Sequence, residues 1–141
     1  LSPIELESRF EVYSEQYVNS IMVEGKLVVD MAKTLIYPAA TRYISDLAIA
    51  NASMVEIGVE PDNSIAQTVA TETNEMMAAV SKLSEALGTH DFASTEEHLQ
   101  FCATEIRSLM DEVRAHADAL EAEVADELWP LPKYQEMLFI K

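Results

Sequence analysis

The chain has 141 residues, of which 49% are hydrophobic, and its 25 acidic residues outnumber 9 basic ones to give a formal charge of −16 at pH 7. This length suffices for one domain with a buried core. The acidic excess argues against nucleic acid or an anionic membrane as partner, because both carry negative charge, and no long uncharged apolar run predicts a membrane span. The single cysteine, Cys102, cannot form an internal disulfide, so we expect a soluble protein of the reducing cytoplasm.

Residues 3–57 have the pattern of one long helix. Ser2 can cap it, Pro3 suits the first helical position, and Glu5 can bond back to the cap. From there on, mostly apolar residues alternate by four and three positions, which predicts a packing face. This face comprises Phe10, Ser14, Tyr17, Ile21, Glu24, Val28, Met31 and Leu35, widened by Val18, Met22, Val29, Ala32 and Ile36.

Two residues interrupt the long helix. Gly25 weakens it by about 1 kcal/mol relative to alanine, and Pro38 removes a backbone donor while its ring crowds the carbonyl of Thr34. The helix could therefore stop at Tyr37 or continue with a kink. Apolar residues keep helical spacing after the proline and no turn residue stands beside it, so we predict a kink at Pro38.

Two further helices are predicted at 64–87 and 95–127, after a turn-rich linker at 58–63. Asn63 or Ser64 caps the first, Gly88 closes it, and Ser94 with Glu97 begins the second. Their packing faces are Ile65, Val69, Glu72, Met76, Ala79, Val80, Leu83 and Leu87, then Leu99, Cys102, Ile106, Leu109, Val113, His116, Leu120 and Val124.

Short connections favour antiparallel packing, so the predicted fold is an all-α, antiparallel three-helix bundle that forms a single helical domain over residues 1–141. The first helix is the longest, and we expect its overhang to lie toward Ser2 or to be covered by the tail. That tail, 128–141, is too apolar for a disordered end. Prolines hold it extended, and its candidate packing or interface residues are Trp129, Pro130, Pro132, Tyr134, Leu138 and Phe139.

No motif indicates a self-contained active site. None of the three histidines has a glutamate three residues before it, which excludes the Glu-x-x-His pairs of carboxylate di-iron bundles, and three scattered glycines form no phosphate loop. We therefore assign no catalytic, cofactor-binding or metal residue. Glu24, Glu72 and His116 lie on apolar faces, where they either form a polar core layer or, as we favour, reach water along their own methylenes.

Several segments resemble the carboxy-terminal region of the type III glutamine synthetases. They are Ser8-Arg9-Phe10-Glu11, residues 30–34, residues 36–40, the Trp-Pro-Leu-Pro-Lys-Tyr run at 129–134 and Met137-Leu138-Phe139. Together they span nearly the whole chain, and the two carboxy-terminal motifs are the most specific.

The resemblance implies that the intact enzyme ligates ammonia to glutamate with ATP and magnesium, in a large ring-stacked oligomer. It places the residues that bind nucleotide, metal and glutamate in a catalytic core that precedes Leu1. This expectation agrees with a chain that begins without an initiator Met. The implied partners are that core and neighbouring subunits, the implied role is structural, and residues 1–141 alone are expected to be inactive. The alternative is a free-standing helical adaptor that binds a partner protein through its kinked helix and apolar tail.

Overall fold

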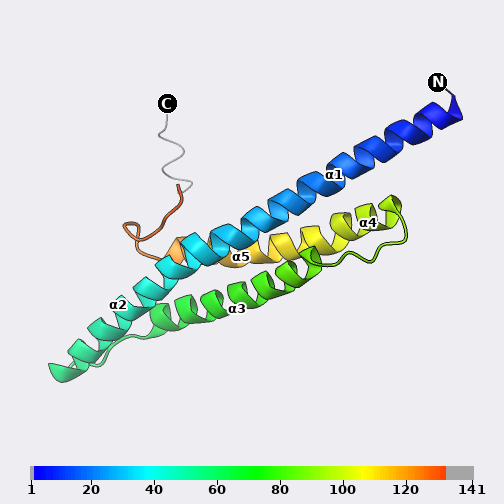
Figure 1. Cartoon of the computed structure of the whole chain (residues 1–141). Coiled ribbons are helices and arrows are strands. Elements are labelled where there is room, and N and C mark those ends of the chain that lie inside the picture. The colour runs from blue at the N-terminus through cyan, green and yellow to red at the C-terminus, as the bar shows by residue number, and fades with distance from the viewer. Residues whose placement is uncertain (1, 133–141) are drawn as a thin grey trace, which may run out of the picture.

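A computed structural model describes residues 2–132, which form three helical runs (Figure 1). The first run consists of α1 (Pro3–Met31), the π-helical turn η1 (Ala32–Ile36) and α2 (Tyr37–Glu56). The second is α3 (Ser64–Leu87), and the third joins α4 (Thr95–Phe101), the π-helical turn η2 (Cys102–Ile106) and α5 (Arg107–Glu123). In Figure 1, α3 runs back beside α2, α5 returns beside α3, and α4 lies beside α1. The prediction of an all-α bundle with a long first helix is confirmed.

The helix continues through Pro38 instead of stopping at Tyr37. The backbone N–H of Tyr37 donates to the carbonyl of Ala32, five residues earlier, which makes η1 a wider turn than the α-helix on either side. Pro38 follows within the first turn of α2, where its missing N–H costs least. The distortion that accommodates the proline therefore lies in the turn that precedes it.

The buried face of the first run differs from the predicted one. It consists of Ser14, Val18, Ile21, Gly25, Val29, Ala32, Ile36, Ala39 and Ala40. Phe10, Tyr17 and Leu35 were expected to be buried, but 55%, 37% and 39% of their surfaces are exposed. The apolar band is wide enough to allow more than one rotation of the helix, and small residues such as Ser14 and Gly25 permit the closer approach.

The core lies where the three runs meet. Its largest fully buried side chains include Met76 and Leu83 of α3, Ile106 of η2, and Met110 and Leu120 of α5. Met110 is 1% exposed although the predicted face did not include it, while Leu109 is only partly buried. The expectation that Ile65 is buried was also wrong, because 44% of it is exposed near the start of α3.

Most helix ends follow the predicted capping chemistry. The Ser2 hydroxyl accepts from the Glu5 N–H at 3.2 Å, and the Ser94 hydroxyl accepts from the Glu97 N–H at 3.1 Å. At α3, however, the predicted caps are replaced by Asp62, whose carboxylate accepts from the Ser64 N–H at 2.9 Å.

The third run ends earlier than the sequence pattern indicated. α5 stops at Glu123, and Val124 turns extended with φ −70° and ψ 139°. A short turn then leads to Trp129, whose backbone N–H donates to the carbonyl of Ala125. Within residues 2–132, no helix is long and apolar enough to cross a membrane.

Candidate functional site

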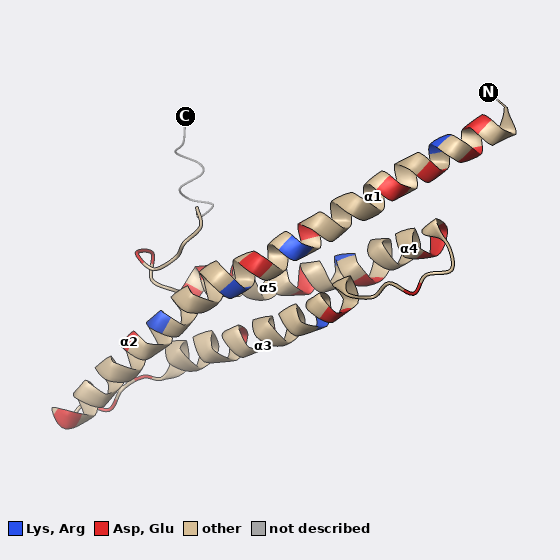
Figure 2. Ribbon diagram, viewed as in Figure 1, with Lys and Arg blue, Asp and Glu red and all other residues tan. Residues whose placement is uncertain are grey.

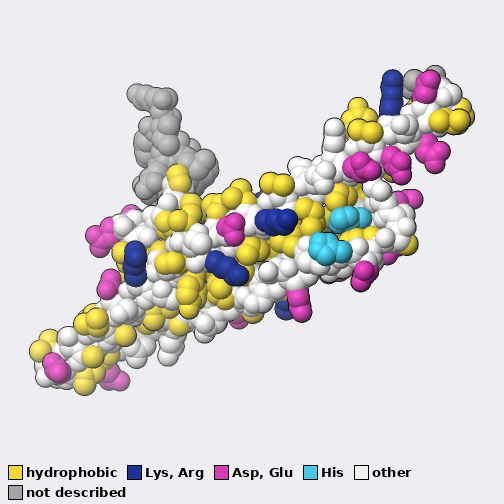
Figure 3. All heavy atoms as spheres, viewed as in Figure 1, with side chains coloured by type: hydrophobic (Ala, Val, Ile, Leu, Met, Phe, Trp, Pro, Cys, Tyr) yellow, Lys and Arg dark blue, Asp and Glu magenta, His cyan; other side chains and the backbone are white. Residues whose placement is uncertain are grey.

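The amino-terminal part of α1 projects beyond the rest of the bundle (Figures 1 and 3). Every residue from Ser2 to Tyr13 is exposed, and Ser14 is the first buried one. The overhang toward Ser2 is therefore present, as expected. We call residues 3–13 the overhang.

Four large side chains line one side of the overhang and the turn that follows it. They are spaced by four, three and four residues, which places them on one helical face. Their exposed fractions are 53%, 55%, 70% and 37% for Leu6, Phe10, Tyr13 and Tyr17, respectively. We call these four residues the overhang stripe.

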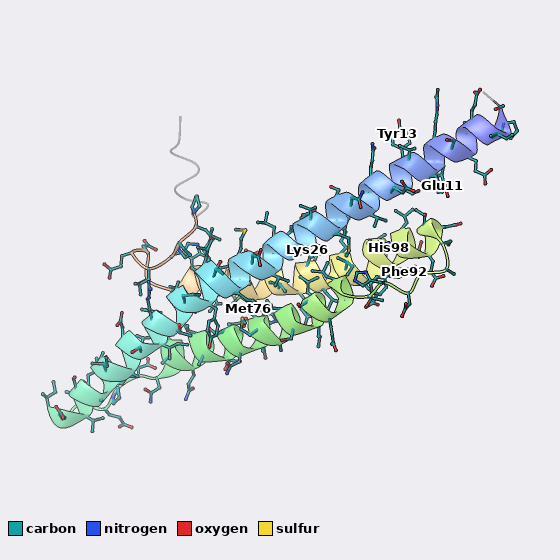
Figure 4. All side chains as sticks on the ribbon, in the orientation of Figure 1. Glu11, Tyr13, Lys26, Met76, Phe92 and His98 are labelled. Carbon is teal, nitrogen blue, oxygen red and sulfur yellow. The ribbon has the colours of Figure 1, made fainter. Side chains whose placement is uncertain are left out.

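The overhang stripe lies largely in solvent, beside the side of α1 that faces α4. Tyr13 and Glu11 are two residues apart, which separates them by roughly 200° around a helix of 3.6 residues per turn, and Figure 4 shows them on different sides of α1. Glu7, Phe10, Glu11 and Ser14 line an open groove of about 170 Å³ against Ser94, at the start of α4. The overhang thus turns Glu7 and Glu11 toward the start of α4, with Phe10 at the edge of the groove and Leu6 and Tyr13 in solvent.

The carboxy-terminal candidates separate into three groups. Trp129 lies in the core cluster with 9% of its surface exposed, and its neighbours Leu128 and Leu131 pack against that cluster. Pro130 and Pro132 are exposed. The remaining candidates, Tyr134, Leu138 and Phe139, lie outside the described residues.

The indole of Trp129 is buried without a hydrogen bond. Its Nε1 is the one buried side-chain nitrogen or oxygen in residues 2–132 that lacks a partner. An unpaired buried donor costs about 1–3 kcal/mol, so apolar contact with the core must outweigh this loss. In the described part of the chain, Trp129 therefore holds the start of the tail on the bundle.

A polar cluster joins the middle of α3 to α5. The Nδ1 atom of His116 lies 2.7 Å from Oε2 of Glu72 and 3.7 Å from Oε2 of Glu75. The side chains of His116 and Glu72 are 20% and 25% exposed, and that of Glu75 is 56% exposed. All three ligand atoms lie within 4.8 Å of one another. Glu72 and His116 thus pair between two helices while both remain partly exposed, an arrangement between the polar core layer and the favoured reach to water.

Glu24 behaves differently, since it reaches solvent as the favoured interpretation predicted. Its Oε1 accepts from Nη2 of Arg114 at 2.7 Å, and the two side chains are 42% and 48% exposed. This pair links α1 to α5. Exposed pairs of this kind contribute at most about 1 kcal/mol.

Two histidines border a groove of about 430 Å³ between α1 and the segment that enters α4. The groove is lined by His90, His98, Phe92 and Glu15, among others, and Figure 3 shows histidine side chains gathered at the end of the bundle near the overhang. The Phe92 ring stacks on the His98 imidazole with centroids 4.2 Å apart. This stacking packs the loop before α4 against the first turn of that helix, and the Phe92 ring covers one face of the His98 imidazole.

Cys102 is a core residue and not a nucleophile. Its side chain is fully buried in η2, and burial raises the pKa of its thiol. A raised pKa keeps the sulfur protonated and poorly reactive at neutral pH.

Comparison with known proteins gives the chain its family. Residues 1–55 match the family described as "Glutamine synthetase C-terminal domain". A type-3 glutamine synthetase of Dictyostelium discoideum is 34% identical over 150 aligned positions, which cover 100% of this chain and 20% of the relative. A glutamine synthetase of Bacteroides fragilis (strain YCH46) is 30% identical over 146 positions, which cover 97% of this chain and 20% of the relative.

The chain thus spans about one fifth of the length of the curated relatives it matches. Both alignments include the overhang and the segment around Trp129, because they cover nearly all of the 141 residues. The segments that suggested the resemblance and the all-α bundle agree with this match. The chain belongs to the carboxy-terminal domain family of the glutamine synthetases, with similarity to those of type III.

Proposed function

We propose that this chain is a non-catalytic helical domain that packs on the catalytic region of a glutamine synthetase. The overhang stripe carries the proposal. Four neighbouring apolar side chains on a solvent-facing helix are a feature of interaction sites, and they contribute nothing to the core of this chain. Their aromatic members, Phe10, Tyr13 and Tyr17, are of the type enriched in interface centres.

The position of the overhang supports the catalytic region as the occupant. In a carboxy-terminal domain, the remainder of the polypeptide joins at the amino end, and in this fold that end is the overhang itself (Figure 1). A contact there requires no long linker, because the stripe begins at Leu6. The catalytic region is therefore held close to the stripe, and this proximity favours their association.

Charge supports a partner of complementary sign. The chain carries a formal charge of −16, and Figure 2 marks acidic residues along the ribbon of the overhang. Glu5, Glu7 and Glu11 lie beside the stripe in sequence. A basic rim on the catalytic region would pair with them and fix the orientation of the contact.

The chemistry of ammonia ligation belongs to the intact enzyme in this proposal. ATP and magnesium would bind in the catalytic region, and residues 1–141 alone should form no glutamine from glutamate and ammonia in their presence. Turnover by the isolated chain would refute the non-catalytic role.

The contact is tested by placing charge on the stripe of the intact synthetase. Phe10→Glu and Tyr13→Glu each bury a carboxylate if the stripe is covered, so we expect association across this surface to weaken by about tenfold or more. Assembly size by light scattering and glutamine formation are the two measurements. Ser8→Glu is the matched control, because it adds the same charge to an exposed position of the overhang outside the stripe.

The isolated chain provides the folding control. Phe10 and Tyr13 lie outside its core, so both variants should keep the helical circular dichroism and the melting temperature of the parent chain. If the stripe variants assemble and react as Ser8→Glu does, the stripe is not the contact surface.

A further inference from the structure

We propose that Glu72, Glu75 and His116 form a binding site for a divalent transition ion of the zinc class. The site lies between α3 and α5, far in sequence from the overhang, and does not depend on the proposed packing function. Its three ligands come from two helices. The Glu-x-x-His spacing, which places both ligands on one helix, therefore does not describe this site.

The donor set suits such an ion. One imidazole nitrogen and two carboxylate oxygens are the ligands by which zinc is commonly held, and a three-ligand site leaves a fourth position for water. The mixed set favours zinc over magnesium or calcium, which prefer oxygen ligands alone.

The distances are those of a site that needs little rearrangement. With bonds of about 2.1 Å, tetrahedral ligands stand roughly 3.4 Å apart. The separations of His116 Nδ1 from the Glu72 and Glu75 oxygens are 2.7 Å and 3.7 Å, on either side of that value. Small rotations of the glutamate side chains would bring all three atoms to bonding distance.

A simple ion pair accounts for only part of this geometry. A proton on Nδ1 can be donated well to Glu72 at 2.7 Å, whereas 3.7 Å is too long for a hydrogen bond to Glu75. No lysine or arginine of residues 2–132 pairs with either carboxylate at salt-bridge distance. A divalent ion would neutralise both glutamates together.

The fixed positions of α3 and α5 and the exposure of the site to solvent both favour binding of an ion. Glu72 and Glu75 are three residues apart on α3, so their side chains lie on one face, and α3 packs extensively against α5. The backbone positions are thus fixed before any ion arrives. Glu75 is 56% exposed, which opens the site to solvent and leaves room for a water ligand.

The experiment is titration of the 141-residue chain with zinc chloride by isothermal calorimetry, with magnesium present in excess. We expect saturable uptake of one zinc per chain. Glu75→Gln should weaken the affinity by about tenfold or more, and because Glu75 is exposed this change should leave the fold intact. Glu85→Gln is the matched control, since Glu85 is an exposed glutamate of the same helix.

A second pair of variants tests the histidine. His116→Ala should also weaken zinc binding by at least about tenfold, whereas His98→Ala in the groove near α4 should leave it unchanged. Circular dichroism establishes that each variant folds. Cobalt(II) then reports the geometry, because low-coordinate cobalt gives intense visible absorption bands that His116→Ala and Glu75→Gln should remove.

Three results would overturn the proposal. The first is the absence of saturable zinc uptake by the parent chain. The second is an affinity of Glu75→Gln within twofold of the parent value. The third is loss of binding in His98→Ala with retention in His116→Ala, which would move the site to the groove.

Discussion

Two parts of the same long helix differ in what surrounds them. From Ser14 to Ala40, a face of small and branched residues is buried against α3, α4 and α5. In the overhang, side chains as large as Phe10 and Tyr13 are more than half exposed. Both parts are apolar and helical, so hydrophobic content alone does not decide burial. A buried face requires a close neighbour, and the overhang meets only the start of α4, across an open groove.

The buried part of the first run also shows what a close approach between two helices requires. In the buried part, a Cβ atom at Gly25 would lie 2.8 Å from Cδ2 of Leu87. The glycine that weakens the helix is therefore the residue that lets α1 approach the end of α3. The overhang has no such constraint and carries bulky residues instead.

The largest expected difference is between a core residue and an overhang residue. Met110→Ala should lower the free energy of unfolding by about 2–5 kcal/mol, because it leaves a cavity at a side chain that is 1% exposed. Phe10→Ala should change it by no more than about 0.5 kcal/mol in the isolated chain. Urea unfolding followed by circular dichroism measures both.

Leu109→Ala refines this contrast at the neighbouring position. A central Leu109 would predict a loss of about 2–5 kcal/mol, but its side chain is only partly buried, so we expect less than for Met110→Ala. Equal losses at both positions, or a large loss for Phe10→Ala, would contradict the burial pattern described above.

Gly25 and Leu87 provide a test of intermediate size. Gly25→Ala gains about 1 kcal/mol of helix propensity, but the added methyl group meets Leu87, and the two effects should nearly cancel. In a Leu87→Ala background the clash is absent, so the same change should be more favourable by about 1–2 kcal/mol.

A double-mutant cycle by urea unfolding isolates this coupling, and Gly88→Ala serves as a control at a glycine outside the contact between α1 and Leu87. If Gly25→Ala has the same effect with and without Leu87, the close approach of α1 to α3 does not limit this position.

The smallest expected effect concerns the cap of α3. Hydrogen bonds from the backbone N–H of Ser64 and then from its hydroxyl lower the pKa of Asp62 from its ordinary value of 3.8. A lowered pKa in the folded state stabilises the fold above 3.8, and this contribution is lost as the pH falls through the folded-state pKa.

Asp62→Asn should therefore speed amide exchange at Ser64 at neutral pH. In acid, where Asp62 of the parent chain is itself protonated, the Ser64 exchange rates of the two chains should lie closer together. Hydrogen exchange followed by NMR measures this, with Glu60→Gln as a control in the same linker. A difference that grows as the pH falls would have the wrong sign for the cap.

Sequence alone determined the helical runs, most of their caps and the bundle, because local capping bonds and a period of 3.6 residues are properties of short segments. Family-specific residues near both ends indicated the synthetase family, and the length of the first helix implied the overhang. These predictions used residues close together in the chain.

Tertiary structure decided which side of each helix is buried and which distant residues meet. A wide apolar band fits several rotations of a helix about its axis, so periodicity could not separate Ser14 from Phe10 or Met110 from Leu109. The π turn at Ala32–Ile36 shifts the register further. The approach of His116 to Glu72 and Glu75 depends on the packing of α3 against α5, because 44 positions separate Glu72 from His116 in the chain.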